Sequence, residues 1–287
     1  MNIWSEGMGS WAYHFILPML ARTFPNTTIT TDPSKPPDLV IKSHYGEPRS
    51  YTCPYIIWSA ESRDVPLKEY PPILEITTFH SSRPNSIYFP HLFGDDCMKD
   101  GVLQRPDPNP KKLWCCSYAH SNHVSMRERL FRTMRAAEPT CYAFGSSCFT
   151  PDNPFVLTRT DRESNASRFT QFAFNIAMEN TVAPGYITEK IGNAFKSGSI
   201  PIYWGTSEIN DFFNPASFVN VSDYTSPEAC GAAAVQIWRD PQKMQPYLDA
   251  PITLNSKVDD YLAVYREYRP WQKPFIDLMR AAYPDLS

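Results

Sequence analysis

Four polar residues with the chemistry to hold a charged ligand lie close together in the sequence: Glu179, Thr188, Glu189 and Lys190. A lysine beside the first turn of a helix can neutralise a diphosphate, since the helix N-terminus itself attracts negative charge. A glutamate at the same place can accept hydrogen bonds from sugar hydroxyls. This spacing is therefore typical of a phosphate and sugar site, although an exposed, charged helix start would have the same composition.

The surrounding pattern predicts the elements that position these residues. An apolar run at 172–178 indicates a buried strand, and 180–185 is rich in turn-forming residues. Residues 186–196 have apolar side chains at helical spacing, and 199–204 indicates a second strand. A strand, a loop and a helix in this order place the loop and the helix start at the carboxyl edge of a parallel sheet, where nucleotide phosphates bind.

The same segment resembles a known family. Its pattern of Phe, Glu-Asn-Ser/Thr, Tyr-x-Thr-Glu-Lys, Asn-Ala and Gly-x-x-Pro is similar to the signature of the α1,3/4-fucosyltransferases, glycosyltransferase family 10. The matching residues are Phe174, Glu179, Asn180, Thr181, Tyr186, Thr188, Glu189, Lys190, Asn193, Ala194, Gly198, Pro201 and Gly205. The stretch 213–224 resembles the short bacterial-type members. The resemblance is strong over 170–224, weaker over 1–150 and slight after 255.

The resemblance implies the GT-B fold, in which two Rossmann-like α/β domains face a central cleft. The 287 residues suffice for two such domains. Alternating prolines at 106, 108 and 110 indicate a linker. We therefore expect an N-terminal acceptor-binding domain at 1–107, a GDP-sugar-binding domain at 108–257, and a helical tail at 258–287 that packs back on the first domain.

The implied reaction is inverting transfer of L-fucose from GDP-β-L-fucose, which needs a base, cations for the departing diphosphate and contacts that orient the sugar. By resemblance, Lys190 contacts the diphosphate and Glu189 contacts the fucose. Tyr186 and Thr188 line the same pocket, and Glu179 with Asn180 faces it from the end of the strand. No essential metal is expected, because GT-B enzymes use side-chain cations and helix dipoles instead.

Glu61 is the candidate base. It follows the apolar strand 55–58, and the stretch from Tyr55 to Glu61 resembles the family's strand that ends in a short turn with a catalytic glutamate. A carboxylate at the end of a strand lies at the edge of a sheet, and partial burial at such an edge can in general raise the pKa of a carboxylic acid towards the working range. The alternative is a solvated glutamate in a turn.

One departure from the family concerns the cation that pairs with the diphosphate. Bacterial members carry an arginine upstream in a glycine-rich loop, whereas the equivalent stretch here, 141–148, has none. Arg159, Arg162 and Arg168 are candidate substitutes. The helix expected at 124–137 carries four arginines, which we interpret as a solvated face. The missing arginine suggests one alternative, a related transferase that uses another GDP-sugar. A second alternative is a catalytically silent relative that binds nucleotides or glycans.

Composition limits the remaining partners. A net charge of −3 and a pI of about 6.1 disfavour a nucleic-acid partner. The sequence has no apolar run long enough to span a membrane and no secretory signal at its start, so a cytoplasmic location is expected, in a bacterium or in the host of a virus. Seven cysteines without a paired metal spacing predict reduced thiols. The family resemblance, rather than composition, implies the acceptor: an oligosaccharide fucosylated through an α1,3 linkage on an N-acetylglucosamine or glucose-type residue.

Overall fold

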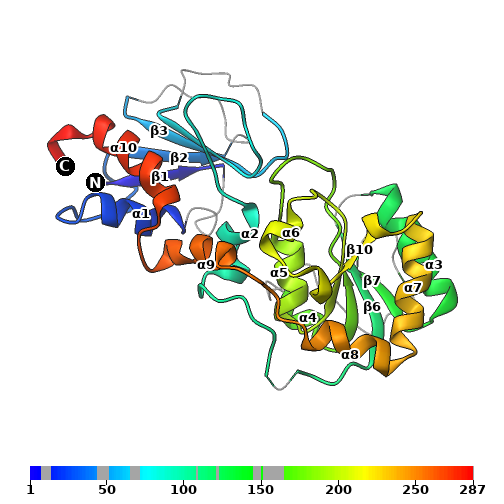
Figure 1. Ribbon diagram of the computed structural model, residues 1–287. Coiled ribbons are helices and arrows are strands. Elements are labelled where there is room, and N and C mark those ends of the chain that lie inside the picture. The colour runs from blue at the N-terminus through cyan, green and yellow to red at the C-terminus, as the bar shows by residue number, and fades with distance from the viewer. Residues whose placement is uncertain are drawn as a thin grey trace. The chain divides into compact units, whose positions relative to one another are not determined.

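The computed structural model describes residues 1–7, 14–43, 52–64, 72–107, 109–120, 123–144, 150 and 165–286. It divides into two compact units (Figure 1). Unit 1 comprises Met1–Val102, Ala183–Ile187 and Ser256–Ser287, and unit 2 comprises Leu103–Val182 and Thr188–Asn255. The expected boundaries were 107/108 and 257/258. The short segment Ala183–Ile187, which was expected in the second domain, groups with unit 1.

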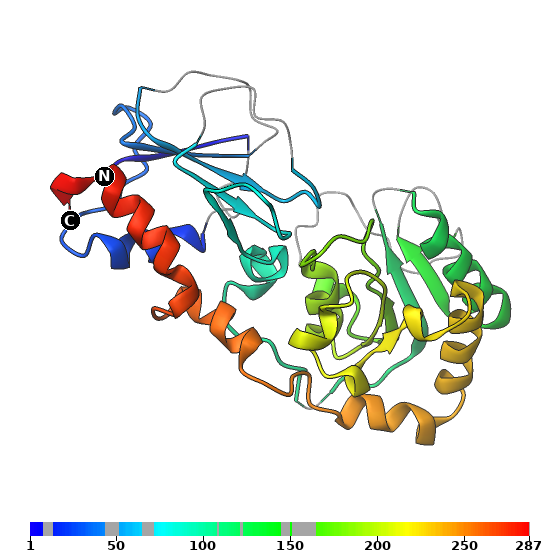
Figure 2. The ribbon, with the colours of Figure 1, turned by 45° about the horizontal axis from the view of Figure 1, so that its top comes forward.

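Unit 1 contains a five-stranded parallel sheet in the order β1-β2-β3-β4-β5 (Figure 2). Its three inner strands are buried throughout, as expected for a parallel sheet covered on both faces. The strands are β1 (Ile3–Glu6), β2 (Leu39–Ser43), β3 (Tyr55–Ser59), β4 (Leu74–Thr77) and β5 (Ser86–Tyr88).

The C-terminal helices complete unit 1. The principal helices are α1 (Ile16–Thr23), α2 (His91–Gly94), α9 (Lys257–Leu262) and α10 (Lys273–Ala282). Helix α10 packs against α1. Arg22 Nη2 donates to the carbonyl of Val264 at 2.6 Å, and the Tyr283 hydroxyl donates to the carbonyl of Asp38 at 2.6 Å. The last 32 residues therefore fold with the first strands of the chain.

Unit 2 contains a second parallel sheet in the order β10-β9-β8-β6-β7. Helices α3 and α7 pack on each other and contribute to a core with the sheet, whereas α5 packs with α4, β8 and β9. The strands are β6 (Trp114–Ala119), β7 (Cys141–Phe144), β8 (Phe172–Ile176), β9 (Ile200–Tyr203) and β10 (Val219–Asn220). The helices are α3 (Ser125–Ala137), α4 (Asn165–Arg168), α5 (Glu189–Lys196), α6 (Ile209–Phe212), α7 (Pro227–Trp238) and α8 (Pro241–Asp249).

The segment that enters unit 2 is held by hydrogen bonds that its side chains Arg105 and Lys112 donate to backbone carbonyls. Arg105 Nη2 donates to the carbonyls of Ser217 and Tyr247, both at 3.0 Å. Lys112 Nζ donates to the carbonyl of Thr170 at 2.8 Å and to that of Ser197 at 3.1 Å, beyond the C-terminus of α5. Burial, with a smaller contribution from the charge of Arg105, lowers the pKa of Lys112 to about 8.

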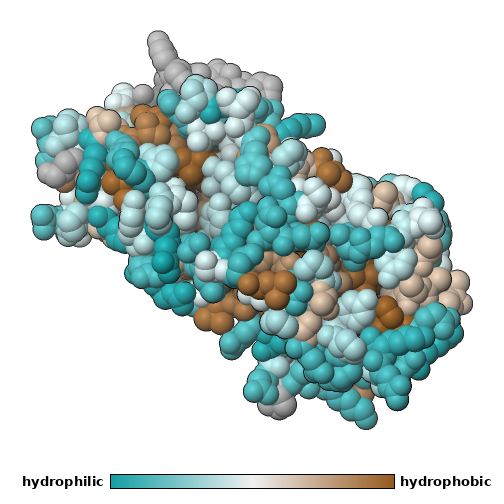
Figure 3. Space-filling model, in the orientation of Figure 1, coloured by the Kyte–Doolittle hydropathy of each residue, from teal (hydrophilic) through white to brown (hydrophobic). Residues whose placement is uncertain are grey.

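The surface is largely polar in the view of Figure 3, where apolar residues form several separate patches. Among the described residues, none of the helices combines the length and the apolar composition that a membrane span requires. The six cysteines in the described part of the chain are free thiols, as predicted, and five of them are buried. Cys148 lies outside the described residues.

Candidate functional site

The order of the strands in unit 2 creates a topological switch point between β6 and β8. From β6 the chain continues through α3 to β7 on one side, and β8 lies on the other side of β6. In open α/β sheets, ligands bind outside the carboxyl ends of the strands at such a point. Helices α3 and α5 begin after β6 and β8 respectively, so their N-termini are at this edge of the sheet.

A buried carboxylate organises the start of α5. Glu179 follows β8 and is 0% exposed. Its Oε1 accepts a hydrogen bond from the Thr188 backbone N–H at 2.8 Å, and the Thr188 hydroxyl lies 2.8 Å from Oε2. Lys190 Nζ donates to Glu179 Oε2 at 3.2 Å and to Thr188 Oγ1 at 2.7 Å. Three of the residues predicted from the sequence therefore form one hydrogen-bonded cluster.

Glu189 and Lys190 remain partly accessible at the first turn of α5. Their carboxylate and ammonium groups approach to 3.6 Å, and the side chains are 26% and 27% exposed. The cluster thus combines a cation, a carboxylate and the positive end of an eight-residue helix. Such a combination can bind a phosphate group and sugar hydroxyls at one place.

The helix starts later than the sequence predicted. Residues 186–188 were expected to be helical, but α5 begins at Glu189. Tyr186 instead packs in a small buried cluster with Phe79 and Ala183 in unit 1. Asn180, also predicted as a donor-site residue, lies exposed in the loop after β8.

The segment Ala183–Ile187 is anchored to unit 1 by three hydrogen bonds. Its carbonyls at Pro184, Gly185 and Ile187 accept respectively from His80 N–H at 3.0 Å, the Tyr88 hydroxyl at 2.7 Å and Leu92 N–H at 3.1 Å. Gly185 has a φ of 77°, which favours glycine. The chain therefore leaves unit 2 after Val182 and returns at Thr188, where Glu179 holds it.

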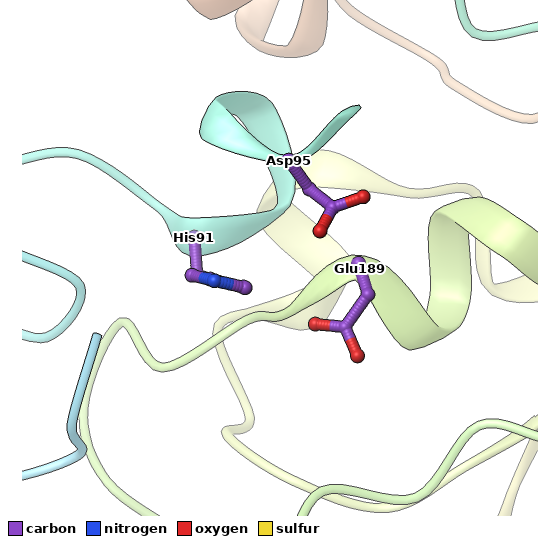
Figure 4. Close-up of side chains that lie close together, drawn as sticks. All are labelled: His91, Asp95 and Glu189. Carbon is purple, nitrogen blue, oxygen red and sulfur yellow. The ribbon is translucent and has the colours of Figure 1, made fainter. Parts of the chain in front are cut away.

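Glu61 lies where the sequence predicted, just beyond the end of β3. It is half-buried, and its backbone carbonyl accepts a hydrogen bond from Thr78 Oγ1 at 2.9 Å. Two further polar side chains, His91 and Asp95, lie at this end of unit 1. Figure 4 shows the side chains of His91 at the start of α2 and of Asp95 just after its end.

Arg127 is a functional candidate that the sequence analysis missed. The interpretation of the α3 arginines as a solvated face is wrong for this residue, which is only 4% exposed. Its charge adds to burial in lowering the pKa of His120, the residue after β6. Arg127 therefore lies in the first turn of the helix that follows the carboxyl end of β6, on the β6 side of the switch point.

The structure separates one of the three proposed substitute arginines, Arg168, from this edge. Arg168 ends α4, which precedes β8, so it lies towards the amino end of that strand rather than the carboxyl end. Arg159 and Arg162 lie outside the described residues. A signal for Arg127 exists in the sequence: it shares a helical face with Leu130, Phe131 and Met134, at the spacing i, i+3, i+4 and i+7.

Comparison with known proteins agrees with this arrangement. Residues 108–276 match the sequence profile of the C-terminal part of glycosyltransferase family 10 (fucosyltransferase). An α-(1,3)-fucosyltransferase of Helicobacter pylori is 30% identical over 156 residues, which is 52% of this chain and 31% of that protein. A putative fucosyltransferase of Acanthamoeba polyphaga mimivirus is 26% identical over 153 residues, which is 52% of this chain and 25% of that protein. Both alignments thus span less than a third of the relative's length.

The solved structures show the fold. A crystal structure of an α1,3-fucosyltransferase with GDP-fucose superposes with a TM-score of 0.65 at 17% identity, covering 98% of this chain and 89% of that one. A structure with GDP superposes with a TM-score of 0.63, also at 17% identity, covering 94% and 92%. The two parallel five-stranded α/β units are therefore those of the GT-B fold.

Proposed function

Because this chain belongs to glycosyltransferase family 10, the fucosyltransferases, we propose that it transfers L-fucose from GDP-β-L-fucose to a carbohydrate hydroxyl with inversion. The observation that carries the proposal is the cluster at the start of α5, where Lys190 and Glu189 stand at the carboxyl edge beside the switch point. A related fold has been solved with GDP-fucose bound, which supports the same ligand here.

The departing diphosphate requires positive charge. Lys190 supplies an ammonium at the N-terminus of α5, and Arg127 supplies a guanidinium in the first turn of α3. The two helix termini add partial positive charge at the same edge. Electrostatic stabilisation of this kind is preorganised, and loss of one such group costs about 3–4 kcal/mol of barrier in well-studied enzymes. Glu189 then binds fucose hydroxyls, with Asn180 and Thr188 lining the donor site in unit 2.

Glu61 is the proposed base that takes the proton from the acceptor hydroxyl. Its place after β3 and its partial burial support this role. The acceptor is an oligosaccharide held by unit 1, and the product is an α1,3 linkage to an N-acetylglucosamine or glucose-type residue. Catalysis without an essential metal remains part of the proposal, and retention of full transfer after treatment with EDTA is its test.

The experiment that tests the proposed reaction separates donor binding from transfer. Glu61→Gln is expected to abolish fucosyl transfer to N-acetyllactosamine while leaving GDP affinity unchanged. Lys190→Ala is expected to lose transfer and to bind GDP much more weakly, with an affinity that is still measurable. Arg129→Ala is the matched control, because its exposed pair with Glu228 lies on the surface of α3. Full transfer by Glu61→Gln would contradict the assignment of the base.

Two alternatives make different predictions in this assay. A transferase for another GDP-sugar was suggested by the missing arginine, and Arg127 removes that motive because it provides a cation at the same edge. A catalytically silent relative would bind GDP and transfer nothing to any acceptor. Product formed only from GDP-fucose would exclude both alternatives.

A further inference from the structure

We propose that Glu179 is a positioning residue, which never touches the donor and acts by holding Lys190 and the first turn of α5 in place. The inference rests on the proposed function and departs from the expectation that Glu179 contacts the donor. Its basis is that both carboxylate oxygens are already engaged inside the protein. Oε1 accepts from the Thr188 N–H, and Oε2 is 3.2 Å from Lys190 Nζ.

The packing around Glu179 prevents its side chain from swinging outwards. The side chain is fully buried, and its own N–H donates to the carbonyl of Trp204 at 2.7 Å. Gly205 leaves room for it, since a Cβ at position 205 would lie 2.9 Å from Glu179 Cγ and would also collide with the Tyr203 hydroxyl. A ligand therefore meets Lys190 and Glu189, which are partly exposed, and not Glu179.

Charge gives the second argument. A buried carboxylate without a cation is strongly unfavourable, so Glu179 holds an ammonium beside it whether or not a ligand is bound. The Thr188 hydroxyl strengthens this arrangement, because it can donate to Glu179 while it accepts from Lys190 at 2.7 Å. Lys190 is thus fixed directly and through Thr188, before any diphosphate arrives.

The backbone gives the third argument. Thr188 is the first residue of unit 2 after the segment Ala183–Ile187. Its N–H is tied to Glu179 at 2.8 Å immediately before α5 begins. The carboxylate therefore sets the point at which the chain re-enters unit 2, and with it the position of Glu189 and Lys190 relative to β8.

The test compares GDP with guanosine, using calorimetry for GDP and saturation-transfer NMR for the weaker nucleoside. Glu179→Gln is expected to weaken GDP binding by about tenfold, the scale of one charge-assisted contact, and to leave guanosine binding unchanged. Glu75→Gln is the matched control: this carboxylate is 3% exposed and pairs with Arg83 at 2.8 Å in unit 1. The control should lose comparable stability and keep its affinity for both ligands.

A double-mutant cycle supplies the decisive readout. On a Lys190→Ala background, Glu179→Gln should cost no further GDP affinity, because the carboxylate acts through the lysine. If Glu179→Gln folds poorly, Glu179→Asp replaces it in the test, because its carboxylate keeps the charge but lies further from Lys190. Glu179→Asp is expected to lose less GDP affinity than Glu179→Gln and to keep its affinity for guanosine.

Three results would overturn the inference: wild-type GDP affinity in a folded Glu179→Gln, equal loss for GDP and guanosine, or a full additional loss on the Lys190→Ala background. GDP binding by wild type without fucosyl transfer would refute the proposed function and leave the role of Glu179 standing. Absence of GDP binding by wild type would refute both.

Discussion

Two glycines of unit 1 allow backbone strain to be separated from steric overlap. Gly185 and Gly101 have similar positive φ values of 77° and 67°. An alanine in the left-handed region costs about 1–2 kcal/mol. At Gly101 the nearest atom to an added Cβ would be the Leu262 carbonyl oxygen at 3.7 Å, which is ordinary contact. Gly101→Ala should therefore show the backbone cost alone.

At Gly185 an added Cβ would lie 2.8 Å from Tyr88 Cε2 and 3.0 Å from its Cζ. The ring cannot move freely, because its hydroxyl donates to the Gly185 carbonyl at 2.7 Å and it contacts the His80 ring with centroids 4.2 Å apart. Overpacking typically costs about 1–3 kcal/mol in addition to the backbone strain. The expected total for Gly185→Ala is therefore roughly 2–5 kcal/mol.

Equilibrium urea unfolding at 25 °C measures both variants against wild type in the same transition, since both glycines belong to unit 1. The free energy of unfolding should fall more for Gly185→Ala than for Gly101→Ala, and its dependence on urea concentration should be the same in both variants and wild type. Equal losses for the two variants would refute the packing of Tyr88 and His80 against the segment that carries Tyr186.

Three further predictions concern unit 2. The pKa of Lys112 is about 8 in the folded chain, against 10.5 for an ordinary lysine, so between these pH values the unfolded state binds more protons than the folded state. The free energy of unfolding of wild type, relative to that of Lys112→Met, should therefore rise by about 1–2 kcal/mol across this pH range, a value reduced for the partial exposure of the lysine. Urea titrations at several pH values measure this rise. Arg127→Ala should weaken GDP binding about 10- to 100-fold in calorimetry, whereas Arg129→Ala should not. In Gly205→Ala the added methyl group overlaps with Glu179 Cγ, so both the melting temperature and the GDP affinity should fall. Wild-type values for both quantities would contradict the packing described.

The sheet and helix elements of unit 2 were largely predictable because their signals are local. The apolar runs at β8 and β9 and the turn-forming residues between them determine strand, loop and helix without reference to the rest of the chain. The start of α5 was predicted three residues early. Tyr186 and Ile187 fit the helical period, but both are buried and both group with unit 1, which a local pattern does not reveal.

The polar core of the site shows what a local pattern leaves out. Glu179 was expected to face the ligand, since nothing in the sequence indicates that it is enclosed by Thr188, nine residues further on. Arg127 was missed for a different reason. Its helical spacing relative to the apolar residues of α3 indicates a buried position, whereas the four arginines of this helix suggest a solvated face. Long-range packing therefore determines the environment of Glu179, whereas the burial of Arg127 follows from its local helical spacing.

The donor site proposed here binds GDP-fucose through Lys190. Calorimetric titration tests this proposal for wild type and Lys190→Ala, with GDP, GDP-fucose, GDP-mannose and UDP-galactose as ligands. Wild type is expected to bind GDP and GDP-fucose with micromolar affinity, Lys190→Ala should bind both much more weakly, and neither protein should bind the uridine donor. Preferential binding of GDP-mannose would contradict the fucose assignment. Absence of binding by every nucleotide would contradict the donor site itself.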